Sequence, residues 1–429
     1  MGNNSKIIKG NFIFTPGFGE LKIAAASFIV IEGKRVKGLY RQLPAGYEGS
    51  LVTDYQDKLI IPGLVDLHAH APQFANRGMG LDLELIPWLE QYTFPEEAKY
   101  NDVVYAAGVY KKFVRELWQW GTTRAVLFGT IHKAATTRLM ALLAQAGLGG
   151  YVGKVNMDRN SPAALSETTA QSLADTEAFI QDTIDRYELV KPIVTPRFVP
   201  SCTPALMSGI AGLAQKYNLP VQSHLAENTR EIAWVRELHP ECPHYAGVYH
   251  KFGLFGQQPT IMAHCIHNDA AELALMAKNK VYMAHCPYSN TNLASGLAPV
   301  RRCIDSGIPV GLGSDIAGGH EVSIAKVMAM AVQVSKLKWL ISGRQEPFFT
   351  IPEVLYLATK GGGSFFGQVG SFEEGYEFDA LVIDDSSLAV AAGNPFTLAD
   401  RLSRFIYIGN DKNIIARYVA GRKIEEPQF

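Results

Sequence analysis

The stretch "LVDLHAHAPQFANRG", residues 64–78, continues the apolar run "KLIIPGLVDL" (58–67) and places His68 and His70 on either side of one alanine. Residues i and i+2 of a β-strand point to the same face, so the two imidazoles face the same neighbour. A buried strand that ends in two same-facing histidines indicates either a metal site or a hydrogen-bonded core. The remaining sequence helps to separate these two interpretations.

Short β-rich runs of this kind recur along the middle of the chain, and most are followed by a helical stretch. We predict amphipathic helices between most of them, for example at 102–121 and 175–190. Eight β runs with intervening helices favour an α/β fold of the (β/α)₈ type, with functional side chains at the C-terminal strand ends. An open, doubly wound sheet is the alternative. The eight runs are residues 63–70, 122–130, 150–158, 194–200, 219–227, 260–267, 281–287 and 308–315.

The two ends of the chain differ from its middle. Residues 6–62 and 376–429 alternate apolar and polar side chains between glycines, as in "SFIVIEGKRVKGLY", "YEFDALVIDD", "RFIYIGN" and "IIARYVAGRKI". This alternation is typical of antiparallel strands. We therefore predict a TIM-type barrel over residues 63–375 and a small composite β-sandwich built from residues 1–62 and 376–429.

Composition excludes several classes of protein. The 40 Lys and Arg residues balance 41 Asp and Glu residues, so there is no basic footprint for nucleic acid. The five cysteines are scattered and form no C-x-x-C pair, which favours a reducing compartment. The N-terminus is polar, without a signal core, and no apolar run is long enough to span a bilayer. We expect a cytoplasmic protein with neither a nucleic-acid nor a membrane partner.

Further histidines and acids occur where later β runs end, and a barrel gathers strand ends around one rim. The two imidazoles of the first run, a third from the fifth and a carboxylate from the eighth would supply three nitrogen ligands and one oxygen ligand. This set suits one divalent ion, Zn²⁺ or Fe²⁺, and does not separate the two; we expect Zn²⁺. The strand-end residues are His224, Glu227, His264, His285 and Asp315.

Glu227 follows His224 by three residues, where the strand gives way to a turn or helix. This position puts a carboxylate near the metal without making it a ligand. A metal that acidifies water and an adjacent acid/base are the requirements of metal-assisted hydrolysis. A helix N-terminal acid is the alternative interpretation of Glu227. His285 remains open between the site and a buried corner, and we interpret His132, His239, His244, His250, His267 and His320 as structural or surface residues.

Several motifs resemble the metal-dependent amidohydrolase superfamily, in its aminohydrolase branch: "PGLVDLHAH", "SHLAE", "AHC" and "GLGSD". Longer segments are similar to the members of that branch that deaminate guanine, namely "HAHAPQFANRG", "LIPWLEQYTFPEEAKY", "TPRFVPSCTP", "SHLAENTREIAWVRELHP" and "GSDIAGGHEVSI". The similarity runs from about residue 60 to about residue 330. The chain ends are similar only to generic sandwich strands of the superfamily.

The resemblance implies one metal ion, because "VTPRFVP" lacks a lysine that could be carbamylated to bridge two. It also implies a homodimer. By resemblance, the metal ligands are His68, His70, His224 and Asp315. Glu227 is the proton shuttle and contacts the substrate, while His264 and Asp315 act on the attacking hydroxide. Gln73, Arg197 and Phe198 are the residues that hold the purine.

The activity implied is the hydrolytic deamination of guanine to xanthine and ammonia. Arg197 can donate hydrogen bonds to O6, the Gln73 amide can donate and accept along the purine edge, and Phe198 offers a face for stacking. An ion pair at a strand end is the alternative for Arg197. A related aminohydrolase of another purine, a pterin or a triazine is the nearest alternative activity. An inactive barrel that serves in binding or assembly is the alternative of another class.

Overall fold

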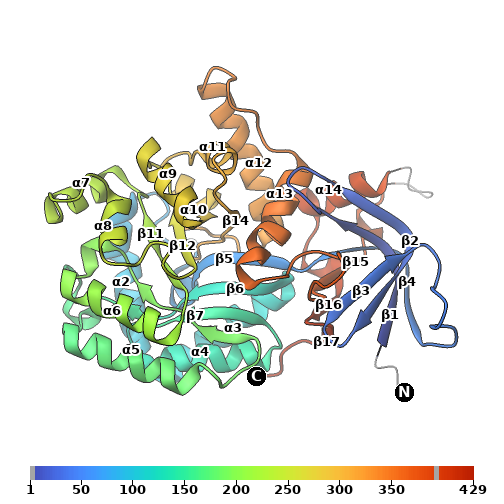
Figure 1. The fold of residues 1–429 in the computed structure, drawn as a ribbon, viewed down its shortest axis with the longest axis horizontal. Helices are drawn as coiled ribbons and strands as arrows, with labels where there is room; N and C mark the ends of the chain where they lie inside the picture. The colour runs from blue at the N-terminus through green and yellow to red at the C-terminus, as the bar shows by residue number, and fades with distance from the viewer. Residues whose placement is uncertain (1–4, 391–395) are drawn as a thin grey trace.

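A computed structural model describes residues 5–390 and 396–429 of the 429-residue chain. Residues 1–4 and 391–395, which belong to the two ends expected to pair, lie outside that description. Parallel strands surrounded by helices make up one part of the molecule, and a sheet lies at its side (Figure 1). The prediction of an α/β fold is confirmed.

The parallel strands form two four-stranded sheets, in the orders β5-β6-β7-β9 and β11-β12-β13-β14. A bridge between Val194 and Val221 joins the two sheets, and the Asp315 N–H donates to the His68 carbonyl oxygen at 2.8 Å after the last strand. The strands are β5 (Leu64–His70), β6 (Thr122–Phe128), β7 (Gly149–Gly153), β9 (Val190–Pro192), β11 (Val221–Leu225), β12 (Thr260–His264), β13 (Tyr282–His285) and β14 (Val310–Leu312).

Each of the eight predicted runs contains a strand, but the fourth differs from its expected bounds. The strand that follows β7 in the sheet is β9, which ends before residue 194. Within the run itself only the two-residue β10 (Thr195–Pro196) forms, paired with β8 (Val155–Asn156). Proline has no N–H to donate to a ladder, so the prolines of "VKPIVTPRFVP" interrupt the strand.

The predicted helix at 102–121 is α3 (Val103–Gln119), which begins where the Asp102 side chain accepts from the backbone N–H of Val104. The helix predicted at 175–190 lies earlier, as α5 (Thr169–Thr183), because Thr168 caps it. The other helices are α1 (Leu85–Trp88), α2 (Phe94–Glu97), α4 (Lys133–Gln145), α6 (Pro204–Tyr217), α7 (Thr229–Leu238), α8 (Tyr245–Lys251), α9 (Ala270–Asn279), α10 (Pro287–Asn292), α11 (Val300–Asp305), α12 (Ile324–Ile341), α13 (Ile351–Tyr356) and α14 (Leu398–Ile408).

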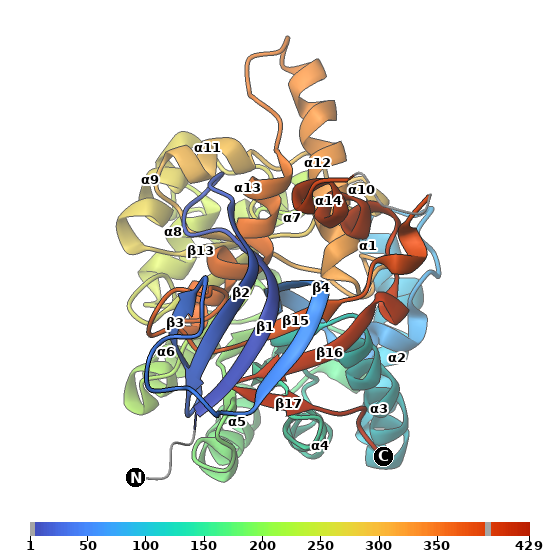
Figure 2. The same cartoon turned by 90° about the vertical axis from the view of Figure 1, so that its right-hand side faces the viewer.

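Strands from both ends of the chain lie in one seven-stranded sheet, in the order β17-β16-β15-β4-β1-β2-β3 (Figure 2). At its middle, β4 pairs in parallel with β1 and antiparallel with β15. An apolar cluster that includes Phe12, Phe372 and Phe378 packs against it. The strands are β1 (Ser5–Phe14), β2 (Lys22–Glu32), β3 (Arg35–Tyr40), β4 (Val52–Pro62), β15 (Ala380–Ile383), β16 (Ile414–Val419) and β17 (Arg422–Ile424).

The prediction that "RFIYIGN" (404–410) is a strand was wrong, because these residues belong mainly to helix α14. Thr397 and Asp400 form a capping box at its start, a strong local signal for a helix. Leu402, Phe405 and Ile406 are buried at a spacing of three and four residues, which fits a helix face better than a strand.

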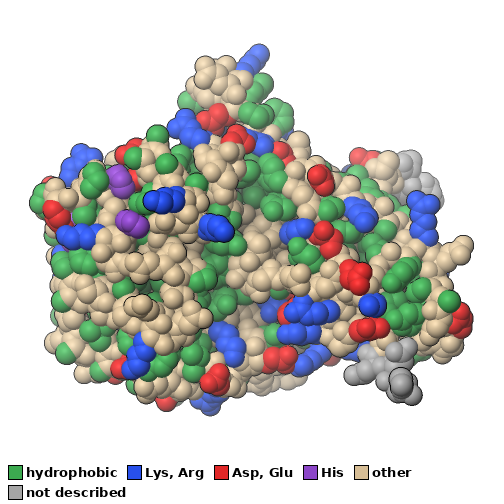
Figure 3. All heavy atoms as spheres, viewed as in Figure 1, with side chains coloured by type: hydrophobic (Ala, Val, Ile, Leu, Met, Phe, Trp, Pro, Cys, Tyr) green, Lys and Arg blue, Asp and Glu red, His purple; other side chains and the backbone are tan. Residues whose placement is uncertain are grey.

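The face seen in Figure 3 has mixed charge, because Lys and Arg side chains are interspersed with Asp and Glu side chains. The end of α12 and the chain that follows project from the body (Figure 1), with Leu337, Leu340 and Ile341 exposed. Within residues 5–390 and 396–429, no helix is long and apolar enough to cross a membrane.

Candidate active site and metal centre

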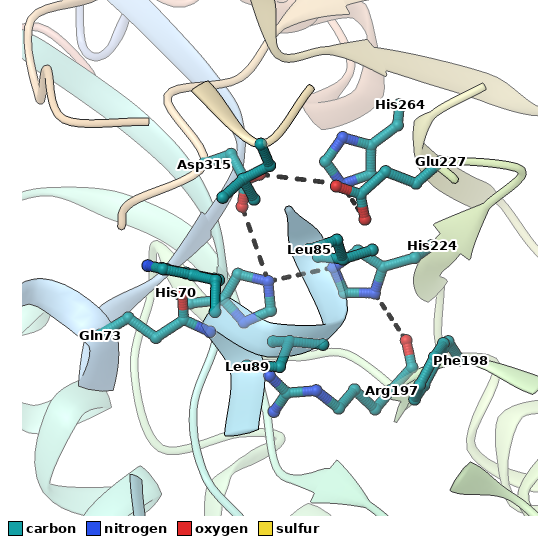
Figure 4. A pocket seen from close by; sticks show the side chains of 12 residues that line it. His70, Gln73, Leu85, Leu89, Arg197, Phe198, His224, Glu227, His264 and Asp315 are labelled. Carbon is teal, nitrogen blue, oxygen red and sulfur yellow. Dashed lines mark hydrogen bonds and ion pairs between the residues drawn. The ribbon is translucent and has the colours of Figure 1, made fainter. Parts of the chain in front are cut away.

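The four predicted metal ligands converge at the C-terminal ends of the strands, and three of them, His70, His224 and Asp315, are seen in Figure 4. His68 and His70 end β5, His224 lies on β11, and Asp315 follows β14. The Nε2 atoms of His70 and His224 lie 3.0 Å apart, and Asp315 Oδ1 lies 3.1 Å from His68 Nε2 and 3.7 Å from His70 Nε2. All four side chains are buried. Donor atoms from distant parts of the sequence therefore face one small volume.

The protonation state of these side chains fits a cation. Burial lowers the pKa of His68, and burial and neighbouring imidazoles lower those of His70 and His224 well below the usual value. Burial opposes ionisation of Asp315, but the imidazoles around it hold its pKa well below the usual value. Neutral imidazoles and an ionised carboxylate are the forms that bind metals.

Hydrogen bonds orient the donor atoms toward the same volume. His224 Nδ1 lies 2.6 Å from the carbonyl oxygen of Arg197 and can only donate to it, which leaves the Nε2 lone pair facing the cluster. His68 Nε2 is buried, and the polar atom beside it is Asp315 Oδ1 at 3.1 Å, another atom of the cluster. These properties suit a metal centre. The groups of donor atoms close enough to hold an ion include His68, His70 and Asp315 in one group and His68, His224 and His264 in another.

Asp66 is a part of the site that the sequence analysis missed. Its fully buried carboxylate accepts from the His68 N–H at 3.1 Å and from the Ser314 hydroxyl at 2.5 Å, so it joins the end of β5 to the residue before Asp315. Burial raises the pKa of Asp66 to about 7. The same i, i+2 rule that selected the two histidines places Asp66 on their face of the strand.

Glu227 and His264 lie beside the ligand cluster. Glu227 Oε2 is 3.5 Å from His264 Nε2, and His264 Nε2 is 3.7 Å from Asp315 Oδ2. The Ser295 hydroxyl donates to Glu227 Oε1 at 3.3 Å, and His264 Nδ1 donates to Asn290 Oδ1 at 2.9 Å. Burial raises the pKa of Glu227 to about 7, a value that suits an acid/base near neutral pH.

Glu227 lies next to the start of helix α7, as the alternative interpretation of this residue expected, but it does not cap the helix. Helix α7 begins at Thr229, and its capping box is formed by Asn228 and Glu231. Glu231 also accepts the backbone N–H of Glu227, so the capping function belongs to a different carboxylate. The Glu227 side chain lines the cavity instead.

The cavity that contains the cluster is bounded on one side by an apolar wall. Gln73, Arg197 and Phe198 line it together with Glu227, His264 and three of the four metal ligands. The wall comes from α1 and the turn after it, and consists of Leu85, Trp88 and Leu89. A cavity lined by both apolar and polar side chains suits a heteroaromatic molecule.

Arg197 forms a buried ion pair, as its alternative interpretation expected, and it also lines the cavity. Its Nη1 atom lies 2.6 Å from Glu97 Oε2, and its guanidinium lies 5.3 Å from the ring centroid of Phe94. Gln73 Nε2 donates to the other Glu97 oxygen at 2.9 Å. The sequence analysis missed Glu97, which lies on the short helix α2 within the quoted segment "LIPWLEQYTFPEEAKY" but was not singled out there.

The remaining histidines do not line this cavity. His285 is buried beside a separate, smaller cavity next to α12, with its Nδ1 unpartnered among the described residues. His239, His244 and His267 line another cavity, between α7, α8 and the start of α9. His132 and His320 are half-buried, and His250 is exposed.

Comparison with known proteins gives consistent results. Residues 59–424 match the sequence profile of the amidohydrolase family. The chain is 37% identical to the guanine deaminase of Dictyostelium discoideum, over 98% of each chain, and 39% identical to that of Mus musculus, over 86% of this chain and 83% of the mouse protein. Its structure superimposes with a TM-score of 0.96 on a guanine deaminase from C. acetobutylicum with guanine bound in the active site. The two are 51% identical, over 98% of this chain and 100% of that one.

Proposed function

Since the chain belongs to the amidohydrolase family, and within it to the guanine deaminases, we propose that it hydrolyses guanine to xanthine and ammonia. One observation carries the proposal. A cluster of His and Asp metal-donor atoms, a carboxylate with a raised pKa and the Gln73–Arg197 pair all line one cavity. A metal-assisted hydrolysis of a flat polar base uses all three features.

The metal we propose is one Zn²⁺ ion held by His68, His70, His224 and Asp315. When bound, such an ion lowers the pKa of a water molecule enough for it to act as a nucleophile at neutral pH. Fe²⁺ fits the same three nitrogen atoms and one oxygen atom. The Asp66 carboxylate, braced by Ser314, keeps the two strand ends that carry these ligands together.

The chain's own side chains move the protons. Glu227 takes the proton of the water that attacks C2 and delivers it to N3 of the ring, and a second proton transfer releases ammonia. The raised pKa of Glu227 supports this role, because a carboxyl that titrates near 7 both accepts and returns a proton. His264 and Asp315, which lie on the same side of the cavity, hold the tetrahedral centre.

Arg197 and Gln73 are the residues we propose to read the base. A guanidinium has five N–H donors, and one of them is used by Glu97, so others remain for the O6 atom of guanine. Phe198 offers its face to the ring. A site of this kind strongly favours guanine over a base without the 6-oxo group, because such a base leaves the buried N–H donors unpaired.

Replacing Arg197 with methionine tests this assignment. The substitution keeps length and bulk but removes all donors, so we expect a loss of ~2 kcal/mol or more in kcat/KM for guanine, with unchanged metal content. A 2-aminopurine substrate lacks the 6-oxo group and should lose much less on substitution. Equal losses of kcat/KM for both substrates in steady-state assays would mean that Arg197 only supports the structure at the strand ends.

The function is tested by measuring ammonia release from guanine, adenine, cytosine, ammeline and a pterin with purified, metal-loaded protein. We expect guanine to be preferred. A preference for another base would assign the chain to a related aminohydrolase. No release from any substrate, with metal bound, would favour a binding or assembly protein.

The finer features of fold and assembly are proposals as well. We propose that the two four-stranded sheets close into one (β/α)₈ barrel over residues 63–375, supported by the Val194–Val221 bridge and the Asp315–His68 bond. We propose that residues 1–62 and 376–429 belong to one composite β-sandwich domain; the pairing of β4 with β15 supports the joining of the two chain ends. We also propose a cytoplasmic homodimer without nucleic-acid or membrane partners; the five free cysteines of the described residues suit a reducing compartment.

A further inference from the structure

Glu97 joins the two side chains proposed to read the base. Its Oε1 atom accepts from Gln73 Nε2 at 2.9 Å, and its Oε2 atom accepts from Arg197 Nη1 at 2.6 Å. The side chain is 2% exposed and does not line the cavity, so it has no direct contact with a molecule bound there. Its influence on a ligand has to pass through Gln73 and Arg197.

The bridge fixes which end of the Gln73 amide faces which neighbour. Oε1 accepts from the backbone N–H of Ala317 at 3.1 Å, while Nε2 donates to Glu97. A carboxylate only accepts and a backbone N–H only donates, so the flipped amide would lose both bonds. One N–H and one lone pair of Gln73 remain, at defined positions, for a ligand.

Arg197 is held on two sides by one short helix. Phe94 and Glu97 are three residues apart on α2 and therefore lie on the same helix face. The first stacks near the guanidinium and the second pairs with it. Within the described part of the chain, the Arg197 guanidinium donates one hydrogen bond, from Nη1 to Glu97. Its other N–H donors stay available for a ligand. The ion pair also neutralises the buried cation, which suits an uncharged ligand.

We propose that Glu97 is a positioning residue that sets the preference for a 6-oxo base. This inference rests on the proposed function and deepens it. By holding Arg197 and the Gln73 amide in one arrangement, Glu97 presents a donor to the 6-oxo group and a donor–acceptor pair to the rest of the purine edge. The carboxylate itself touches neither the base nor the reacting atoms.

The test is Glu97→Gln, measured with guanine and with 2-aminopurine. The new amide can accept from only one of its two partners and turns an N–H toward the other. We expect kcat/KM for guanine to fall at least ~10-fold, with a smaller fall for 2-aminopurine and unchanged metal content. In an Arg197→Met background the same substitution should change kcat/KM for guanine less than ~3-fold, because residues that act as a unit are not additive.

Glu96→Gln is the matched control. Glu96 is the neighbouring buried acid on α2, but its partners are Lys99 and Tyr105, away from the cavity. We expect E96Q to leave the ratio of guanine to 2-aminopurine activity unchanged. Where E97Q does not fold, Glu97→Asp replaces it: it keeps the charge, shortens the reach and should lose the same guanine preference.

The outcomes separate the two proposals. A wild-type chain that releases no ammonia from guanine would overturn the proposed function, and this inference with it. An active wild type whose E97Q variant loses both substrates equally, or loses as much in the R197M background, would overturn the inference alone. A lower melting temperature with unchanged kcat/KM would also overturn it, because Glu97 would then only stabilise the fold.

Discussion

His70→Ala is expected to abolish deamination and to remove the metal, while the chain remains folded. The His70 Nε2 atom lies 3.0 Å from that of His224 and 3.7 Å from Asp315 Oδ1, so its loss removes one of four converging donors. Three remaining ligands hold a divalent ion far more weakly, and the attacking water then keeps a pKa too high for reaction at neutral pH. His68→Ala should behave in the same way.

Elemental analysis of the purified variant, an ammonia assay and circular dichroism check this result together. His250→Ala is the control, because His250 is an exposed histidine that does not line the cavity. We expect it to keep wild-type metal and activity. Full activity of H70A or H68A without bound metal would contradict the metal centre.

Glu227→Gln should bind metal and guanine like the wild type and turn over at least ~10²-fold more slowly. Glutamine keeps the shape of the side chain and can still accept from Ser295, but it cannot take and return a proton. The loss is therefore expected in kcat, with little change in the affinity for guanine.

Single-turnover kinetics and guanine titration of the metal-loaded variant separate the two effects. Glu237→Gln, on the exposed side of α7, is the control and should keep the wild-type kcat. A near wild-type kcat for E227Q would mean that another group moves the proton. Loss of metal from E227Q would mean that Glu227 belongs to the ligand cluster.

The strand ends could be predicted from sequence, because two local rules are enough. The β-rich runs locate the strands, and a period of two puts His68 and His70 on one face. Parallel strands bring their C-terminal ends together, which relates His68 to His224 and Asp315 without any alignment. Asp66 follows from the same rule and was overlooked. The fourth strand and the run at 404–410 were less predictable, because prolines and a capping box overrode the apolar pattern.

Glu97 could not be predicted in this way. It lies on a helix of one turn, between two other short helical segments, and its two partners come from the ends of different strands. Neither spacing nor periodicity relates residue 97 to residues 73 and 197. Arg197 illustrates the same difficulty: an ion pair and a substrate contact appeared as alternatives in the sequence, whereas in the structure the residue that forms the ion pair also lines the cavity.

The position of β4 has a consequence for the making of the protein in the cell. One edge of β4 pairs with β1, which is synthesised just before it, but the other edge pairs with β15, which leaves the ribosome only after most of the chain. At ordinary rates of translation the delay is on the order of tens of seconds. Throughout that time an apolar strand edge containing Leu59 to Ile61 stays open to association with other nascent chains. Damage to β15 should therefore lower the yield of folded protein more than the rate of the enzyme that does fold.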